Sequence, residues 1–359
     1  MPLSLHQLFR RAHEKLQQGD LSGTISDCTR ALRLNPTHTA TLAIRARARL
    51  AAEDHDGALL DSTRALELGG PRADCLYVKG AVLLTRQQFE VAVKDLTAAL
   101  ELRPNEVGAL CIRGAARLKL KDHAGAIADA SAALAINGKR IDAWCCRAAA
   151  RLEIGDVAVA VEDCTAALKL SPKCVNALCV RAQGFLRQQQ YEDAVADAKA
   201  AVALNPRRQD AMCCSAVSRL SLEDIPGCLE DAQAALAVDA KSFKALCIVA
   251  VARYVEGDME AALAETTAVL DTSPDRLEAL CCRAAALIAL GQPQQAEEDT
   301  RRGRAAHPRR VEVWALDRGW ARQQWSTANW DAGHSDKVLE SQGAGNSLRA
   351  ALRWVQAGA

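Results

Sequence analysis

The sequence predicts an all-α fold, an array of paired helices, from three observations. Six stretches of the chain align with one another, and each begins 34 residues after the one before it. Large and small residues alternate within each 34-residue unit in a pattern that suits two amphipathic helices. A proline recurs near the end of most units, where it would stop a helix. Together these features indicate helical repeats and not a set of separate globular domains.

The register of the aligned stretches extends over most of the chain. The stretches are ALCIRGAARL (109–118), AWCCRAAARL (143–152), ALCVRAQGFL (177–186), AMCCSAVSRL (211–220), ALCIVAVARY (245–254) and ALCCRAAALI (279–288). Extended in both directions, they place nine repeats in residues 5–310 without insertion or deletion. The predicted repeats are 5–38, 39–72, 73–106, 107–140, 141–174, 175–208, 209–242, 243–276 and 277–310.

Each repeat is expected to form a first helix, helix A, and a second, helix B. Position 4 is large and position 8 is small, and because both lie on one face of helix A, helix B can approach closely there. An aspartate after the break suits the N-cap of helix B, because its carboxylate accepts a backbone N–H. The capping candidates are Asp20, Asp54, Asp122, Asp156, Asp224 and Asp258. The prolines that should end helix B are Pro36, Pro104, Pro172, Pro206, Pro274 and Pro308.

This period, with its small residues and proline, resembles the tetratricopeptide repeat over residues 5–310. The resemblance implies a right-handed α-solenoid of nine helix-turn-helix repeats. Two departures are visible: Leu, Ala and Cys replace most of the family's aromatic residues, and Gly70, Gly138 and Ala240 stand where proline is expected. The 35-residue RNA-binding helical repeat fits less well, because the period is one residue short and the chain has no basic bias.

Composition excludes several classes of protein. The chain of 359 residues carries 45 basic and 44 acidic side chains, which argues against nucleic acid as a partner. No stretch approaches the roughly 18 apolar residues of a membrane helix, and the first 20 residues lack the apolar run of a signal peptide. We therefore expect a cytoplasmic protein without a membrane partner, in which the 14 cysteines are reduced thiols.

A ladder of ion pairs is predicted inside the repeats. Position 7 of helix A is basic in seven repeats, and position 23 of helix B is acidic. Folding an antiparallel hairpin between them brings the two positions to the same level. A charged ligand track is the alternative, but position 7 shares the stripe that faces helix B, which favours structural pairs. The predicted pairs are Arg11–Asp27, Arg45–Asp61, Lys79–Asp95, Arg113–Asp129, Arg147–Asp163, Arg181–Asp197 and Arg283–Asp299.

Repeats seven and eight have Ser215 and Val249 at position 7. There Arg219 and Arg253, one turn later, are placed to reach Asp231 and Glu265 instead.

Cysteine recurs at position 5 of six consecutive repeats, from Cys111 to Cys281. A second set, Cys146, Cys214 and Cys282, recurs every 68 residues, which hints at duplication of a two-repeat unit. Zinc needs four ligands around one ion, whereas packed helices lie about 8–10 Å apart, and no C-x-x-C is present. We therefore expect no metal and no cofactor, and assign these cysteines to tight packing.

The resemblance implies that helix A lines a concave groove and that positions 2, 5, 6, 9, 12 and 13 face a bound peptide. Cysteine, alanine and leucine at these positions predict a narrow, apolar middle of the groove, with polar residues mainly toward its N-terminal end. For any single polar residue, an ordinary solvated role is the competing interpretation. The candidate partner-binding residues are Arg10, His13, Arg47, Lys119, Cys145, Glu153, Asn176, Cys179, Gln183, Arg187 and Cys213.

Chaperone-binding members of the family hold an acidic C-terminal tail with Lys at position 5, Asn at positions 9 and 6, and further basic residues at 2 and 6. Here position 5 is never Lys, and positions 6 and 9 are never Asn. The clamp residues are absent, so capture of acidic chaperone tails is not predicted.

The C-terminal segment continues the register for one more helix. Residues 311–324 are expected to cap the last repeat, 325–345 to form an irregular linker, and 346–356 to form a short helix. That helix either docks on the array or presents Trp354 to a partner, and docking is favoured.

The sequence features favour a binding protein over an enzyme. No nucleophile–base constellation or phosphate-binding loop is visible, so we do not expect an enzyme. The predicted function is a non-catalytic scaffold of adaptor or co-chaperone type that binds a protein or peptide segment in its groove. The alternative is a structural subunit of a larger assembly, for example cytoskeletal or ciliary, held through its convex face and C-terminal tail.

Overall fold

The computed structural model describes residues 3–70, 72–275 and 277–306, and all regular structure in these residues is α-helical. The chain forms two compact units, unit 1 (Met1–Pro172) and unit 2 (Lys173–Ala359). The predicted capping helix 311–324, linker 325–345 and short helix 346–356 lie outside the described residues.

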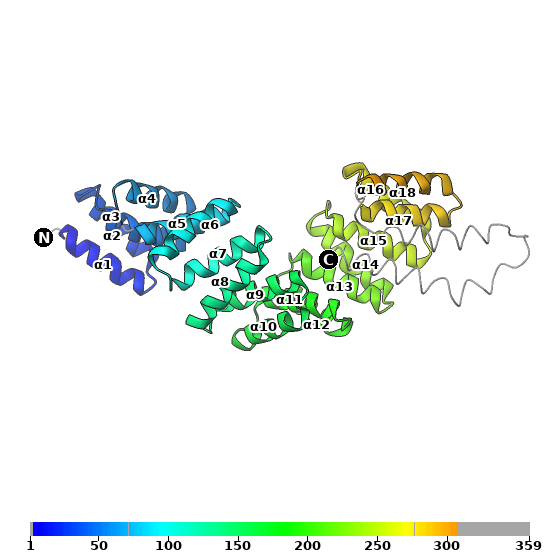
Figure 1. Cartoon of the computed structure of the whole chain (residues 1–359), viewed down its shortest axis with the longest axis horizontal. Coiled ribbons are helices and arrows are strands. Elements are labelled where there is room, and N and C mark those ends of the chain that lie inside the picture. The colour runs from blue at the N-terminus through cyan, green and yellow to red at the C-terminus, as the bar shows by residue number, and fades with distance from the viewer. Residues whose placement is uncertain (1–2, 71, 276, 307–359) are drawn as a thin grey trace, which may run out of the picture. The chain divides into compact units, whose positions relative to one another are not determined.

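The helices alternate between A helices, which carry odd numbers, and B helices, which carry even numbers (Figure 1). Unit 1 contains α1 (Leu5–Gln17), α2 (Leu21–Leu34), α3 (Thr39–Ala51), α4 (His55–Glu67), α5 (Arg72–Thr85), α6 (Phe89–Leu102), α7 (Val107–Lys119), α8 (His123–Ile136), α9 (Ile141–Ile154) and α10 (Val157–Leu170). Unit 2 contains α11 (Val175–Arg187), α12 (Tyr191–Leu204), α13 (Gln209–Ser221), α14 (Ile225–Val238), α15 (Phe243–Glu256), α16 (Met259–Thr272), α17 (Leu277–Ala289) and α18 (Pro293–Ala306). Each A helix begins at the first residue of a predicted repeat, except that α5 begins one residue earlier.

Within each unit, an A helix packs against its own B helix, each B helix packs against the following A helix, and successive A helices also contact one another. Small residues at position 8 allow the close approach. Ala12 and Ala46 are fully buried, and a Cβ added at Gly80 would lie 2.5 Å from the Leu96 side chain. Each unit is therefore a stack of helical hairpins whose A helices share one face.

The turn between helices A and B has one conformation throughout the described residues. The residue two positions before the B helix always has positive φ, and it is glycine in some repeats, such as Gly155 at 94°. In five repeats it is not glycine, although β-carbon crowding makes this conformation costly for other residues. These five are Glu53, Gln87, Lys121, Gln189 and Glu223, with φ between 60° and 63°.

Aspartate caps of helix B form in five of the six predicted positions. In four, the carboxylate accepts the N–H of a glycine three residues later, as Asp20 does from Gly23. Asp258 accepts the N–H of Ala261 instead. Asp156 is the N-cap of α10 but makes no side-chain cap bond, which corrects the prediction. The residue at the donor position is Val159, where four of the other repeats have glycine and one has alanine.

The seven ion pairs between positions 7 and 23 are all present. Each arginine donates from Nε and Nη2 to the two oxygens of its aspartate, and Lys79 lies 3.1 Å from Asp95. In Arg11–Asp27, Nε lies 2.6 Å from Oδ2. The closest N–O distance in the other five arginine pairs is 2.6 to 2.8 Å; these pairs are Arg45–Asp61, Arg113–Asp129, Arg147–Asp163, Arg181–Asp197 and Arg283–Asp299. The carboxylates are buried except that of Asp95, which is half-buried, so the pairs help to fix the register of the two helices.

Further contacts make several of these pairs part of a network. In repeats one, two, four and five, a second basic residue one turn along helix A reaches the same carboxylate, at 2.6 Å for Arg151 and Asp163. Some of the position 7 arginines also donate to a hydroxyl on the B helix of the preceding repeat, as Arg113 does to Thr97 at 3.1 Å. One guanidinium therefore joins three helices and links neighbouring repeats.

Repeats seven and eight use other contacts. Ser215 donates a hydrogen bond of 2.6 Å to Asp231, and Arg219 lies 3.3 Å from the same carboxylate, as predicted. Arg253 pairs with Glu256 on its own helix at 2.8 Å, in place of the predicted Glu265. The two helices of the seventh hairpin are thus still joined by a hydrogen bond and an ion pair, whereas Arg253 forms its ion pair within α15.

The cysteines contribute to the core. Of those that the structure describes, all but Cys174 and Cys282 are buried, and none forms a disulfide. Burial raises the pKa of the Cys28, Cys146, Cys214 and Cys228 thiols to about 12, so these groups remain protonated at neutral pH. They act as small apolar residues in the packing between helices.

The ion-pair network predicts a large difference between two aspartate substitutions. Asp163→Asn leaves Arg147 and Arg151 without their buried carboxylate, and we expect the free energy of unfolding to fall by about 3 kcal/mol. Asp142→Asn removes an exposed partner of Arg140, and should cost less than about 1 kcal/mol. Urea unfolding followed by circular dichroism measures both, and equal losses would contradict the structural role of the buried pair.

Acid should weaken the first repeat through Asp27. Hydrogen bonds from Arg11 and Lys15 hold the pKa of Asp27 below its ordinary value of 3.8. The stabilising contribution is therefore complete above the unfolded-state pKa and is lost as pH falls through the lower folded-state pKa. Between about pH 5 and pH 2, wild type should lose more unfolding free energy than Asp27→Asn. Parallel losses in urea titrations at each pH would count against this assignment.

Thiol labelling should separate the buried cysteines from the partly exposed ones. With an aromatic disulfide reagent at pH 8, we expect Cys174 and Cys282 to react in the folded protein and the buried thiols to react only in denaturant, because attack requires an accessible thiolate. Cys174→Ser should remove one early-reacting thiol. Uniform rapid labelling of all 14 cysteines without denaturant would show that the core is not closed.

Candidate functional site

The A helices carry the exposed residues predicted for the groove. In unit 1, Arg10, His13, Arg47, Lys119 and Glu153 are exposed. Arg10 pairs with Glu14 at 3.0 Å, and His13 lies 3.1 Å from Gln17, so both are engaged along α1 itself.

In unit 2, Asn176 and Arg187 are exposed and Gln183 is half-buried. Asn176 accepts a hydrogen bond of 3.0 Å from Arg208, which immediately precedes the next A helix. The structure therefore joins Asn176 to a residue that the sequence analysis did not select.

The three cysteines predicted to face a partner lie in the interior. Cys145, Cys179 and Cys213 are 9%, 2% and 1% exposed. The start of the following repeat lies against position 5, as Arg208 and Asp210 lie against the Cys179 thiol. Partner contact through these thiols is therefore not supported by their position, and the exposed groove residues remain the candidates.

A hollow of about 50 Å³ lies on the A-helix face of unit 1. Arg47 reaches it from α3, Asp74 and Tyr77 from α5, Arg103 from the end of α6, and Glu106 from the start of α7. These residues come from two successive repeats, and Arg47, Asp74 and Tyr77 occupy groove positions 9, 2 and 5. The hollow is thus formed where adjacent repeats meet on the predicted binding face.

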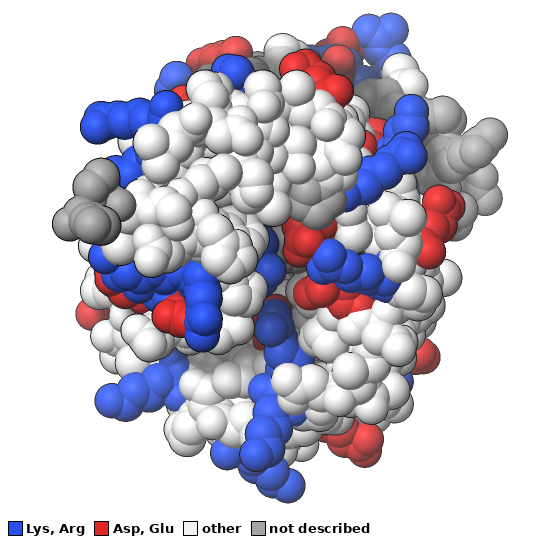
Figure 2. Space-filling view, turned by 90° about the vertical axis from the view of Figure 1, so that its left-hand side faces the viewer, with Lys and Arg blue, Asp and Glu red and all other residues white. Residues whose placement is uncertain are grey.

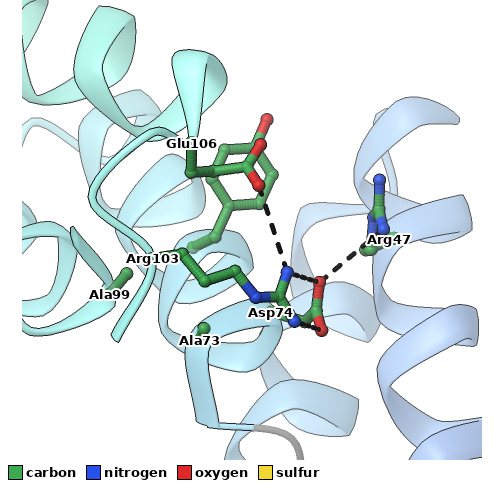
Figure 3. A pocket seen from close by; sticks show the side chains of 7 residues that line it. Arg47, Ala73, Asp74, Ala99, Arg103 and Glu106 are labelled. Carbon is green, nitrogen blue, oxygen red and sulfur yellow. Dashed lines mark hydrogen bonds and ion pairs between the residues drawn. The ribbon is translucent and has the colours of Figure 1, made fainter. Parts of the chain in front are cut away.

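Asp74 is the centre of the charges in the hollow. Figure 3 shows the Arg103 guanidinium facing the Asp74 carboxylate, with Arg47 approaching from a neighbouring helix. The two bonds from Arg103 to Asp74 are 2.9 and 2.6 Å, whereas Arg47 lies 3.6 Å from Asp74 and Glu106 lies 4.0 Å from Arg103. The hydrogen bond to Asp74 raises the pKa of Arg103, and burial raises the pKa of the Tyr77 hydroxyl.

Similar arginine–aspartate pairs recur at two later repeat junctions. Arg140 binds Asp142 at 2.9 and 2.5 Å in unit 1, and Arg208 binds Asp210 at 2.9 and 2.8 Å in unit 2. Partial burial opposes ionisation of Asp142, but the hydrogen bond and charge of Arg140, together with hydrogen bonds from the Ala143 N–H and Cys111, outweigh it and lower the Asp142 pKa. The two later pairs lie within R-x-D at 140–142 and 208–210, and the motif recurs at 72–74, where Asp74 pairs with Arg103 instead.

Charges of both signs are mixed on the face of the molecule that Figure 2 shows. Figure 2 shows Lys and Arg side chains interspersed with Asp and Glu, with uncharged surface between them. Within the described ranges, no group of three or more His, Cys, Asp or Glu residues is placed to hold a metal ion. None of the described helices is long and apolar enough to cross a membrane.

Comparison with known proteins identifies the repeats. The family model for the tetratricopeptide repeat matches residues 77–140 and 147–208. No curated protein matches the chain.

Solved structures of tetratricopeptide repeat proteins match parts of the chain. A tetratricopeptide repeat protein from Parabacteroides merdae is 17% identical, with a TM-score of 0.50 over 68% of this chain and 97% of that one. A thermophilic TPR protein of Thermus thermophilus is 18% identical, with a TM-score of 0.44 over 50% of this chain and 98% of its own. YrrB, described as a TPR protein with an unusual peptide-binding site, is 15% identical, with a TM-score of 0.41 over 52% and 97% of the two chains.

The matched segments lie within the predicted register, and the described helices form consecutive hairpins like those of the first of these structures. Residues 77–140 and 147–208 are therefore tetratricopeptide repeats, and the described helices share the fold of a tetratricopeptide repeat protein.

Proposed function

We propose that the protein is a non-catalytic interaction scaffold, and that the A-helix face of unit 1 binds a segment of a partner protein. Tetratricopeptide repeats generally mediate protein–protein interaction, which supports the class of function. The observation that carries the proposal is the hollow around Asp74, because polar groups from two repeats converge there on groove positions. An adaptor or co-chaperone role is the form of scaffold that we favour.

The partner is not expected to be an acidic chaperone tail. The hollow has Tyr77 at position 5, where the clamp needs lysine, and Asp74 and Glu106 beside its arginines would repel an incoming carboxylate. A partner segment that offers hydrogen bonds and small apolar side chains fits this face better than one that offers only negative charge.

The B-helix side supports a second candidate function. Exposed aliphatic residues recur at position 30, at the ends of the B helices of unit 1. They are Leu34, Leu68, Leu102, Ile136 and Leu170, with exposed fractions from 42% to 60%. A row of such residues favours attachment of the array to a larger assembly through this side.

Arg47→Glu should discriminate between the two surfaces. It reverses a half-exposed charge at the hollow, and we expect recovery of groove partners in affinity purification with mass spectrometry to fall at least tenfold. Glutamate at the buried Cys145, Cys179 or Cys213 would test folding instead, because it would place a charge in the core.

Arg64→Glu is the matched control, since Arg64 is exposed on α4, the B helix of the same repeat. Circular dichroism must show equal helicity in all variants. Partners that survive Arg47→Glu but are lost from a Leu34→Ser, Leu102→Ser double variant would overturn the groove proposal in favour of the B-helix side.

A further inference from the structure

The hydrogen-bonding groups around the hollow divide into two sets. Arg103 and Asp74 satisfy each other through two short bonds, so neither is offered to a ligand. Among the described residues, Arg47 and Glu106 have only long pairings, 3.6 Å to Asp74 and 4.0 Å to Arg103, which exceed hydrogen-bond length. Their side chains are 50% and 42% exposed. Arg47 therefore retains N–H donors, and Glu106 retains carboxylate acceptors.

Tyr77 supplies a second donor beside them. Its ring packs against the cores of two neighbouring clusters, which include Val78, Leu96 and Leu110. In the part of the chain that the structure describes, its hydroxyl makes no hydrogen bond and is not among the buried unsatisfied atoms. Gly108 leaves room next to that hydroxyl, because a Cβ at this position would lie 3.1 Å from it. The hydroxyl is thus accessible at the hollow and stays protonated.

The charges that line the hollow are balanced, which favours a neutral ligand. Arg47 and Arg103 are matched by Asp74 and Glu106, so an incoming carboxylate or ammonium group would add an uncompensated charge to a partly desolvated site. A neutral amide adds none, and it carries both an oxygen acceptor and N–H donors. The remaining lining residues are alanines, which add no competing polar side chain.

We propose that the hollow is a receptor for a neutral amide of the partner segment, with its oxygen accepting from Arg47 and Tyr77 and its N–H donating to Glu106. The amide is either the carboxamide of Asn or Gln or a main-chain peptide group. This inference rests on the proposed function and names the chemistry that its binding face recognises.

Selection of a displayed library of random decapeptides against the full chain tests both the proposed peptide binding and the amide receptor. We expect selected peptides to bind wild type about fivefold more tightly than Tyr77→Phe, because that variant keeps the packed ring and removes only the hydroxyl. Arg47→Ala and Glu106→Ala should weaken binding at least as much. Tyr191→Phe, the same change on α12 in unit 2, is the matched control and should leave affinity unchanged.

Two peptide series identify the source of the amide. If it is a side chain, replacing one Asn or Gln by Glu or Leu should abolish the dependence on Tyr77. If it is main chain, N-methylation at one peptide position should abolish the dependence on Glu106, because it removes the N–H and keeps the oxygen.

Different outcomes overturn different claims. Peptides that bind equally to wild type, Tyr77→Phe and Glu106→Ala would refute the amide receptor and leave groove binding intact if Arg47→Glu still weakens them. Anchoring by Asp or Glu, with affinity that falls steeply with salt, would also refute it. Failure to enrich any peptide would count against the proposed function itself.

Discussion

The buried aspartate of helix B, held by an arginine or lysine of helix A, is the interaction on which the rest of the architecture depends. Removing such a carboxylate from water is costly, and it is tolerated here because up to two basic side chains and several N–H donors satisfy it. The same arginine can also reach a hydroxyl of the preceding repeat. Register within a hairpin and the placement of the next hairpin are therefore set by one group.

This constraint explains how a binding face can arise from short, similar units. Once every hairpin has the same register, positions 2, 5 and 9 of successive A helices fall on one side of each unit. Arg47 and Asp74 come from different repeats yet lie 3.6 Å apart. Recognition is then decided at the junctions between repeats, where one side chain replaces another without disturbing the helices.

Much of this could be read from the sequence, because the decisive features are periodic. The 34-residue register located the helices, and the antiparallel hairpin paired Arg147 with Asp163 and its equivalents. The non-periodic features were missed. Arg103 and Glu106 lie in the loop between repeats, and their convergence with Arg47 depends on the angle between hairpins, which no spacing within one repeat encodes.

The cysteines at position 5 were also misplaced because the sequence pattern describes one repeat at a time. The groove assignment treated each repeat alone, and so placed Cys179 and Cys213 on an exposed wall. In the structure, the N-terminal end of the following A helix covers this position, and the two thiols are almost fully buried. Exposure in a stacked array is a property of two repeats, whereas the sequence pattern describes one.

The five non-glycine residues in left-handed turns have a consequence for the evolution of the chain. Each forgoes about 1 kcal/mol that glycine would recover at the same backbone angles. A fold that bears this cost five times has not been driven by selection to its greatest stability. Substitutions at exposed A-helix positions such as Arg47 cost less than this, so recognition can diversify while the hairpins stay folded.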